Sequence, residues 1–243
     1  KAAESNHPWG MFEYSNLLEV GRGVDKDLTK SDQYLVKAAD LDVPPAQYKL
    51  GMKLYKEGKV SDAISYLRKA ADAGNVDAMV ELAKILMKED EEANLDEIIK
   101  LLKRASKLGN TEATILCGDI LFRHNRYDDA YKMYKKAALK NNTEAMFKFA
   151  RMNEEGQGAR KNPTTAAEYY KKCVDKDYVP SYYYLGRCYQ NGNGVEQDYD
   201  EAVRLYQRSA DGGSADGMVG IGRLYKYGLG VDDDEDKAFE YFT

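Results

Sequence analysis

Small and apolar residues recur along the whole chain in units of 32 to 36 residues. A small residue marks each unit, and these residues are Gly10, Ala46, Ala78, Ala113, Ala145, Ser181 and Gly217. An apolar residue follows four positions later, the next position is again small, and a mostly apolar position comes three residues after that. Because offsets of 4, 5 and 8 residues lie on one face of a helix, the pattern predicts an amphipathic helix in every unit. Its small positions allow a second helix to approach closely.

A second helix is predicted in each unit after a connection. Its anchor positions are Ser31, Ala63, Ile98, Ala130, Ala166, Ala202 and Ala238. Four positions after each anchor stands a large apolar residue, which is Tyr134, Tyr170 and Tyr206 in three successive units. This column explains part of the excess of tyrosine, which numbers 20 residues against 6 Phe and 1 Trp.

The ends of the predicted helices carry residues that suit helix termini. Four second helices are followed by residues that accept the left-handed conformation, namely Gly74, Gly109, Asn141 and Gly213. Asn162 and Asp198 are expected to be N-cap residues of two of the second helices. The acidic run from Asp232 to Asp236 lacks the oxygen spacing and glycine of an EF-hand loop, and we expect it to cap the last helix instead.

The connection between the two helices identifies the type of repeat. Four units carry a Gly-x-Gly connection, which reads Gly21-Arg22-Gly23-Val24, Gly156-Gln157-Gly158-Ala159, Gly192-Asn193-Gly194-Val195 and Gly228-Leu229-Gly230-Val231. The segment 69–74 reads Lys-Ala-Ala-Asp-Ala-Gly. The chain thereby resembles the Sel1-like repeat, whose units carry a Gly-x-Gly-Val loop and end in Ala-Ala-x-x-Gly. In units two and four the anchors of the two helices are 17 rather than 21 residues apart, which resembles the tetratricopeptide repeat (TPR), and unit three is intermediate with residues 89–94 as its connection.

The resemblance implies an all-α fold, a right-handed α-solenoid of about seven antiparallel two-helix repeats. We expect one array over residues 1–243, with repeats at about 6–41, 42–74, 75–109, 110–142, 143–177, 178–213 and 214–243. The helical pattern is unfinished at Thr243, so the last helix is expected to be truncated and the chain to be part of a larger chain or complex.

Composition and charge narrow the classes of function. The chain is 43% apolar and 32% charged, carries a net charge of −5, and intersperses its basic and acidic residues, which argues against a nucleic-acid partner. No apolar run approaches the length of about 18 residues that membrane insertion needs. Cys117, Cys173 and Cys188 show no paired or metal-ligand spacing, which favours a reducing compartment and a cytoplasmic location. The alternative is the endoplasmic-reticulum lumen, for which the single glycosylation sequon at residues 141–143 is weak evidence.

We find no candidate catalytic residue, metal site or cofactor site. The two histidines, His7 and His124, have no nucleophile or metal partner nearby in sequence. The Gly-x-Gly connections follow a helix rather than a strand, so they do not match a dinucleotide-binding loop. The sequence therefore predicts a protein without enzymatic activity or cofactor.

A partner-binding surface is expected on the concave face. In the tetratricopeptide family the first helix of each repeat lines this face, and the resemblance carries over ten positions: Tyr48, Met52, Lys84, Ile115, Phe147, Arg151, Tyr183, Arg187, Val219 and Arg223. The three arginines stand one repeat apart and predict a ladder for a protein or extended peptide with acidic groups. Alternatively, they pair with Glu154 and Glu155 and only solubilise the face.

The expected function is a non-catalytic scaffold or adaptor for protein–protein interaction. One alternative is a fixed structural component of a large macromolecular assembly. Another is an adaptor subunit of an endoplasmic-reticulum ubiquitin-ligase complex, a role found among Sel1-like proteins. A third is an enzyme like the β-lactam-binding relatives, but those carry paired cysteines in each repeat and this chain does not.

Overall fold

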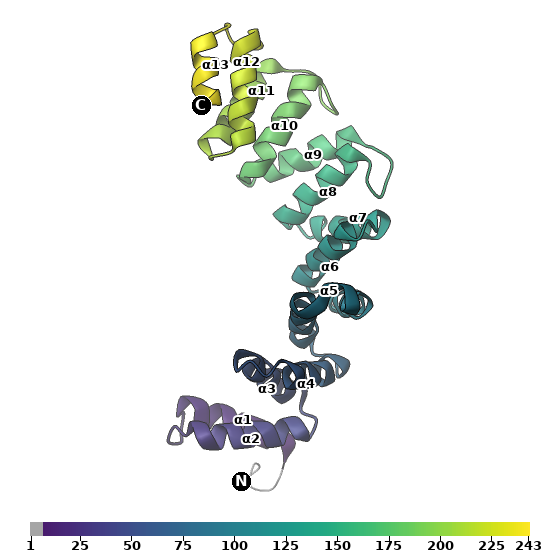
Figure 1. Cartoon of the computed structure of the whole chain (residues 1–243), viewed down its shortest axis with the longest axis vertical. Coiled ribbons are helices and arrows are strands. Elements are labelled where there is room, and N and C mark those ends of the chain that lie inside the picture. Colours follow the sequence, from purple (N-terminus) through teal and green to yellow (C-terminus); the bar gives the residue numbers. More distant parts are fainter. Residues whose placement is uncertain (1–6) are drawn as a thin grey trace. The chain divides into compact units, whose positions relative to one another are not determined.

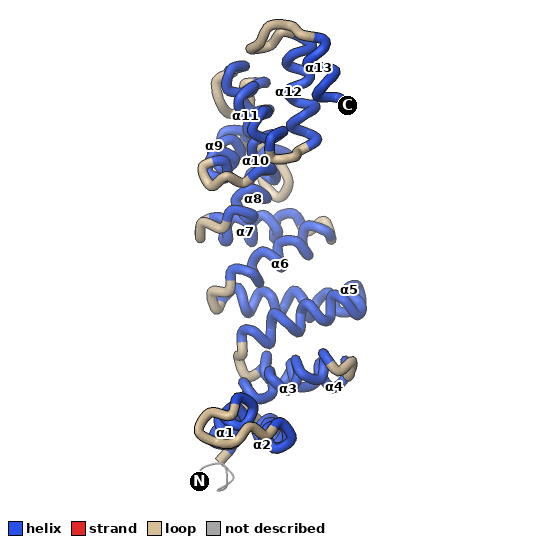
Figure 2. The backbone as a smooth tube through the Cα atoms, turned by 90° about the vertical axis from the view of Figure 1, so that its left-hand side faces the viewer, coloured by secondary structure: helices blue, strands red, loops and turns tan. Residues whose placement is uncertain are grey.

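A computed structural model describes residues 7–243, and within them the chain forms thirteen α-helices and no strand (Figures 1 and 2). The helices are α1 (Pro8–Val20), α2 (Leu28–Asp40), α3 (Pro44–Lys56), α4 (Val60–Asp72), α5 (Val76–Lys107), α6 (Thr111–Arg123), α7 (Tyr127–Ala138), α8 (Thr143–Glu155), α9 (Pro163–Val174), α10 (Val179–Asn191), α11 (Tyr199–Asp211), α12 (Ala215–Tyr227) and α13 (Glu235–Phe242). Most are 12 or 13 residues long and follow one another as helix hairpins, so the predicted all-α solenoid is confirmed.

The chain is organised as two compact units, which divide after Ala113. In the first unit α1 packs on α2 and α3 on α4, while α2 contacts α3 and α4 contacts α5. In the second unit the hairpins are α8 with α9, α10 with α11 and α12 with α13, and each second helix contacts the first helix of the next repeat. The first helices α10 and α12 also touch directly.

The third repeat differs from the prediction. Its two helices are joined into the single element α5, which contains one non-helical residue, Asp90, with φ −163° and ψ 97°. The Asp90 carboxylate accepts a hydrogen bond from the backbone N–H of Ala93 at 3.0 Å. Asp90 is therefore the N-cap of the second half, and the expected connection over residues 89–94 shrinks to one residue.

The small positions allow the close approach of paired helices, as expected. A Cβ atom on Gly118 would lie 2.7 Å from the ring of Tyr134, and one on Gly186 would lie 2.8 Å from the ring of Tyr206. Tyr170 and Tyr206 are among the largest fully buried side chains. The tyrosine column thus forms core, and the rings of Tyr134 and Tyr206 pack on the backbone of a first helix.

The predicted helix ends are confirmed. The side chains of Asn162, Asp198 and Asp234 each accept a backbone N–H in the first turn of α9, α11 and α13. The residues predicted to be left-handed have positive φ: Gly74, Gly109, Asn141 and Gly213.

Candidate functional site

In the first unit, Tyr48 and Met52 line a cavity of about 720 Å³ together with apolar side chains of α1 and α2. Lys49 at its rim bonds to Asn16 at 2.8 Å and also pairs with Glu19. Burial, followed by the charge of Glu81, raises the pKa of Tyr48, so this phenol stays neutral at physiological pH. Most of the cavity surface is apolar, and two of the lysines that line it, Lys49 and Lys53, pair with carboxylates of α1 and α2.

Neither Lys84 nor Ile115 is available to a partner, because Lys84 is ion-paired and Ile115 is buried. The Lys84 ammonium lies 2.9 Å from the carboxylate of Glu81 and 2.7 Å from that of Glu112. Ile115 is only 8% exposed and packs in a small core with Ala137 and Ala145. The apolar character of this column at position 115 therefore reflects core packing.

In the second unit, Phe147 belongs to an aromatic cluster that supports two of the arginines. Its ring lies 5.2 Å from the ring of Tyr184 and 5.9 Å from that of Tyr170. The guanidinium of Arg151 lies over the Tyr184 ring at 5.3 Å, and that of Arg187 lies 5.7 Å from the same ring. The cluster holds both guanidiniums against flat aromatic surfaces, which is a favourable cation–π arrangement.

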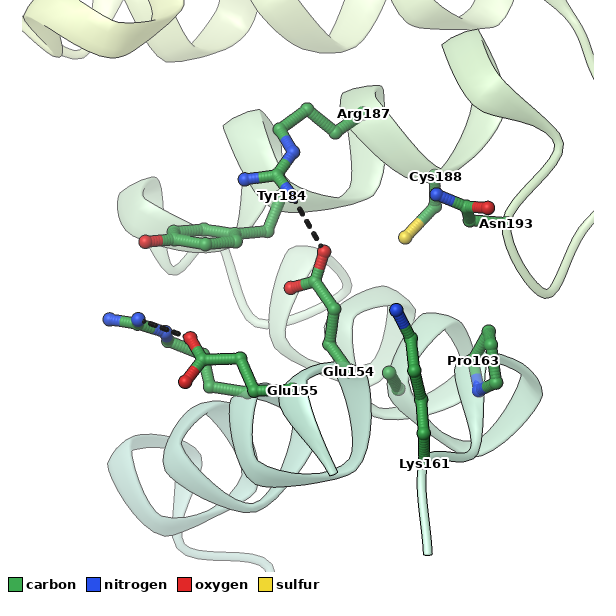
Figure 3. Close-up of a pocket in the computed structure, with 10 residues that line it drawn as sticks. Glu154, Glu155, Lys161, Pro163, Tyr184, Arg187, Cys188 and Asn193 are labelled. Carbon is green, nitrogen blue, oxygen red and sulfur yellow. Dashed lines mark hydrogen bonds and ion pairs between the residues drawn. The ribbon is translucent and has the colours of Figure 1, made fainter. Parts of the chain in front are cut away.

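Arg151 and Arg187 line one cavity of about 250 Å³, shown in Figure 3. Arg151 pairs with Glu155 on its own helix at 2.6 Å, whereas Arg187 reaches from α10 to Glu154 of α8 at 2.9 Å. In Figure 3, Glu154 and Arg187 point toward each other across the pocket, and Lys161 enters it from the loop between α8 and α9. The sequence analysis gave ion pairs with Glu154 and Glu155 as an alternative to partner binding, and Arg151 and Arg187 do form these ion pairs.

The pair of Arg187 and Glu154 is part of a partly buried network. The Glu154 side chain is 15% exposed and also accepts the hydroxyl of Tyr170 at 2.7 Å. Burial lowers the pKa of Arg187, but the charge of Glu154 acts together with Tyr183 and Tyr206 to outweigh this effect, and the net shift is upward. Burial raises the pKa of Tyr170, and the charge of Glu154 raises it further. Arg187 is thus held as a cation whose charge is compensated inside the protein.

Arg187, Tyr183, Val219 and Arg223 line a second cavity, of about 340 Å³. Its other lining residues include Gln190, Asn191, Tyr206 and Gly220. The predicted residues of repeats six and seven are therefore brought together, and Arg187 belongs to both cavities. We call the residues of α8, α10 and α12 that line these two cavities the first-helix face.

The residues of this face that the sequence analysis did not name include Tyr184, Gln190 and Gly220, and it named Glu154 only as a general partner of the arginines, not as the partner of Arg187 across repeats. All lie one or three positions from a predicted position on the same helix. The available signal was the 36-residue step that relates Glu154 to Gln190 and Tyr184 to Gly220. Comparing the residue types at these steps would have drawn attention to them.

Within residues 7–243, no group of three or more His, Cys, Asp or Glu side chains is arranged to hold a metal ion. Over the same residues, no helix combines the length and apolar character needed to cross a lipid bilayer. Cys117, Cys173 and Cys188 are buried, and none of them forms a disulfide.

Comparison with known proteins agrees with the repeat pattern. The family model of the Sel1 repeat matches residues 10–43, 44–75, 76–110, 117–142, 143–178, 179–214 and 215–243. A search of curated proteins gave no match. Among solved structures, c5321, a protective antigen present in uropathogenic Escherichia coli strains and displaying an SLR fold, is 26% identical with a TM-score of 0.75 over 98% of this chain. This chain covers 53% of c5321, about half of its length.

Two further structures share the fold. A Sel1 repeat protein from Oxalobacter formigenes is 23% identical, with a TM-score of 0.66 over 99% of this chain and 72% of its own. YrrB, a TPR protein, is 20% identical, with a TM-score of 0.52 over 72% of this chain and 88% of its own. Protein–protein interaction is the role typical of such repeats. With seven matched repeats over nearly its whole length, the chain belongs to the Sel1 repeat family.

Proposed function

We propose that the protein is a non-catalytic scaffold that binds an extended segment of another protein along the first-helix face. The observation that carries this proposal is the shared lining of neighbouring cavities by equivalent side chains of successive repeats. Arg151 and Arg187 line one cavity, and Arg187 and Arg223 line the next. A partner segment that runs along the face would meet an arginine at each of three successive repeats, and solenoid proteins typically bind extended partners in this way.

The charge of this face favours an acidic partner segment. Arginine offers two N–H groups in the geometry that a carboxylate accepts, and such charge-assisted bonds are about twice as strong as neutral ones. Tyr183 and Val219 add apolar surface within the same cavity. Among the solved structures of the same fold, YrrB is described as having an unusual peptide-binding site, which is consistent with peptide recognition by a solenoid of this kind.

We place the protein in the cytoplasm. Its three cysteines are buried and form no disulfide, and Cys173 and Cys188 have pKa values raised to about 12, chiefly by burial. Unpaired thiols are compatible with a reducing compartment. Visible glycosylation at Asn141 in the natural host would instead favour the endoplasmic-reticulum lumen.

Charge reversal on the first-helix face tests the scaffold function. The double variant Arg187→Glu/Arg223→Glu should abolish capture of the natural partner, measured by pull-down with the purified full chain followed by calorimetry with the identified segment. The matched control is Lys172→Glu/Arg204→Glu, which makes the same charge change on exposed positions of α9 and α11. Capture that survives in the first variant, or is lost equally in the control, contradicts the proposal.

A fixed structural component of a larger assembly is the second candidate. Large apolar side chains are exposed on the helices at both ends of the described chain, with Val20 at 67% and Phe239 at 68%. A contact with another subunit would cover such exposed apolar side chains. Analytical ultracentrifugation separates the two functions, because a scaffold should remain monomeric at micromolar concentration and an isolated assembly component should self-associate.

A further inference from the structure

The three arginines of the first-helix face are not equivalent, and the repeat symmetry shows why. Gln190 follows Glu154 by 36 positions (190 − 154), and Arg223 follows Arg187 by the same step (223 − 187). The hydroxyl of Tyr206 donates to Gln190 Oε1 at 2.6 Å, just as that of Tyr170 donates to Glu154 at 2.7 Å. The hydrogen bond from the tyrosine is retained in the next repeat, but the negative charge that compensates Arg187 is missing beside Arg223.

The aromatic support is missing as well. Arg187 lies over the rings of Tyr183 and Tyr184, at 5.7 Å from each centroid. One repeat on, these positions hold Val219 and Gly220. A Cβ atom at Gly220 would lie 2.8 Å from the Tyr206 ring, so the position is closed to a larger side chain unless that ring moves.

Arg223 is thus a cation without an internal partner. It is exposed, and among residues 7–243 no hydrogen bond, ion pair or ring contact is made by its guanidinium. No described residue that lines the 340 Å³ cavity carries a carboxylate, while Gln190 and Asn191 contribute side-chain amides. Burial raises the pKa of Tyr206, and the charges of Arg187 and Arg223 both oppose this rise, which reports that they lie near its hydroxyl.

We propose that Arg223, together with the amide groups of Gln190 and Asn191, binds a carboxylate group and is the anion-binding position of the first-helix face. This inference rests on the proposed scaffold function and assigns the recognition of acidic groups to one repeat instead of to the whole ladder. A single uncompensated cation matches a monoanion, because Arg187 is already neutralised by Glu154. The carboxylate comes from a Glu or Asp side chain or from a C-terminus of the partner.

A reciprocal exchange of Glu154 and Gln190 tests the site with nearly isosteric changes. Gln190→Glu places a carboxylate beside Arg223 and keeps an acceptor for Tyr206. Glu154→Gln removes the counter-ion of Arg187 and keeps an acceptor for Tyr170. The first variant should close the site at Arg223, and the second should open an equivalent site at Arg187.

The measurement follows the Nε–Hε signals of the arginines by NMR while small carboxylates are titrated at constant ionic strength. The probes are N-acetylglutamate α-amide, whose carboxylate is in the side chain, and N-acetylalanine, whose carboxylate is C-terminal. In the wild type the Arg223 signal should shift and saturate, and the probe with the higher affinity identifies the source of the carboxylate. Gln190→Glu should weaken this binding at least about tenfold, the scale of one charge-assisted pair. Glu154→Gln should produce a new saturable shift at Arg187.

An Arg223 signal that never responds in the wild type, or responds equally in Gln190→Glu, overturns the site. The test of the Arg223 site can fail or succeed independently of the test of the scaffold function. Capture of the natural partner that is lost in Arg187→Glu/Arg223→Glu but unchanged in Gln190→Glu keeps the function and refutes the site. If the NMR titrations give the expected shifts but Arg187→Glu/Arg223→Glu still captures the natural partner, the carboxylate site is supported and the scaffold function is refuted.

Discussion

Tyr134, Tyr170 and Tyr206 occupy the same position of three successive second helices but donate to different acceptors. Their hydroxyls bond to the carboxylate of Asp119 at 2.6 Å, to that of Glu154 at 2.7 Å and to the amide oxygen of Gln190 at 2.6 Å. The three rings are buried in the core of their repeats in the same way. The acceptor decides whether the repeat retains a negative charge on the first-helix face.

Removing single hydroxyls should measure this difference. Tyr170→Phe loses a bond to a charged acceptor and should reduce the free energy of unfolding by about 2 kcal/mol, while Tyr206→Phe loses a bond to a neutral acceptor and should cost about 1 kcal/mol. Urea unfolding followed by circular dichroism gives both values. Equal costs, or a larger cost at Tyr206, would contradict the assigned role of the charge.

The buried thiols make a prediction about pH. The folded pKa values of Cys173 and Cys188 are raised to about 12, chiefly by burial, against an ordinary value of 9.0. Between pH 9 and 12 the unfolded chain loses these protons and the folded chain keeps them, so the stability they contribute is present below pH 9 and lost as the pH rises. The melting temperature should fall over this range, and the fall should be smaller in Cys173→Ala/Cys188→Ala. A thiol reagent at pH 8 that labels the folded protein as fast as the urea-unfolded chain would refute the burial.

At the scale of secondary-structure elements, each Gly-x-Gly loop of the second unit lies against the second helix of the preceding repeat. A Cβ atom on the second glycine would lie 2.2 Å from the carbonyl oxygen of Tyr127 at Gly158, 2.2 Å from that of Pro163 at Gly194, and 2.7 Å from the carbonyl carbon of Tyr199 at Gly230. The equivalent Gly23 of the first repeat meets nothing within 4 Å. The loop therefore positions a repeat on the one before it.

Replacing the second glycine of the loop should disrupt its contact with the preceding repeat. Gly194→Ala combines left-handed strain with a backbone clash and should cost about 3 kcal/mol or more, whereas Gly213→Ala has φ +81° in open space and should cost only about 1 kcal/mol. Both residues lie in the second unit, so one urea denaturation series compares them. Similar costs would show that the loop does not hold the stacking of the repeats.

The repeat pattern predicted most of the elements because helix faces and helix ends are encoded locally. Gly118 and Gly186 were placed correctly at helix contacts because a close approach needs a small residue wherever it occurs. The α5 helix was not foreseen, since residues 89–94 are charged and polar like a connection, and only the cap formed by Asp90 lets both halves follow one another directly. The site was predicted in part, because the positions of Arg187 and Arg223 follow from the repeat period. Whether each of these two guanidiniums has an acidic partner depends on a residue of the preceding repeat, and the period alone does not give it.

At the scale of the whole molecule, the chain consists of two compact units, each with its own buried residues. Met11, Leu35 and Leu50 pack together in the first, and Tyr170, Leu185 and Leu205 in the second. Each unit has a cavity to which its first helices contribute: the cavity of the first unit has a mostly apolar surface and is also lined by lysines, whereas that of the second unit is lined by arginines. The units therefore offer two surfaces of different chemistry.

Site-specific photo-crosslinking shows whether a bound partner lies along the first-helix face. Benzoylphenylalanine is introduced at Val219, which lines the 340 Å³ cavity, or at Leu139, which is exposed at the end of the second helix α7. After irradiation in the native host, peptides joined to the protein are sequenced by mass spectrometry. If the partner binds along this face, crosslinks to an acidic segment form at position 219 and few form at position 139. Crosslinks that form equally at both positions, or only at position 139, would show that the partner does not bind along the first-helix face.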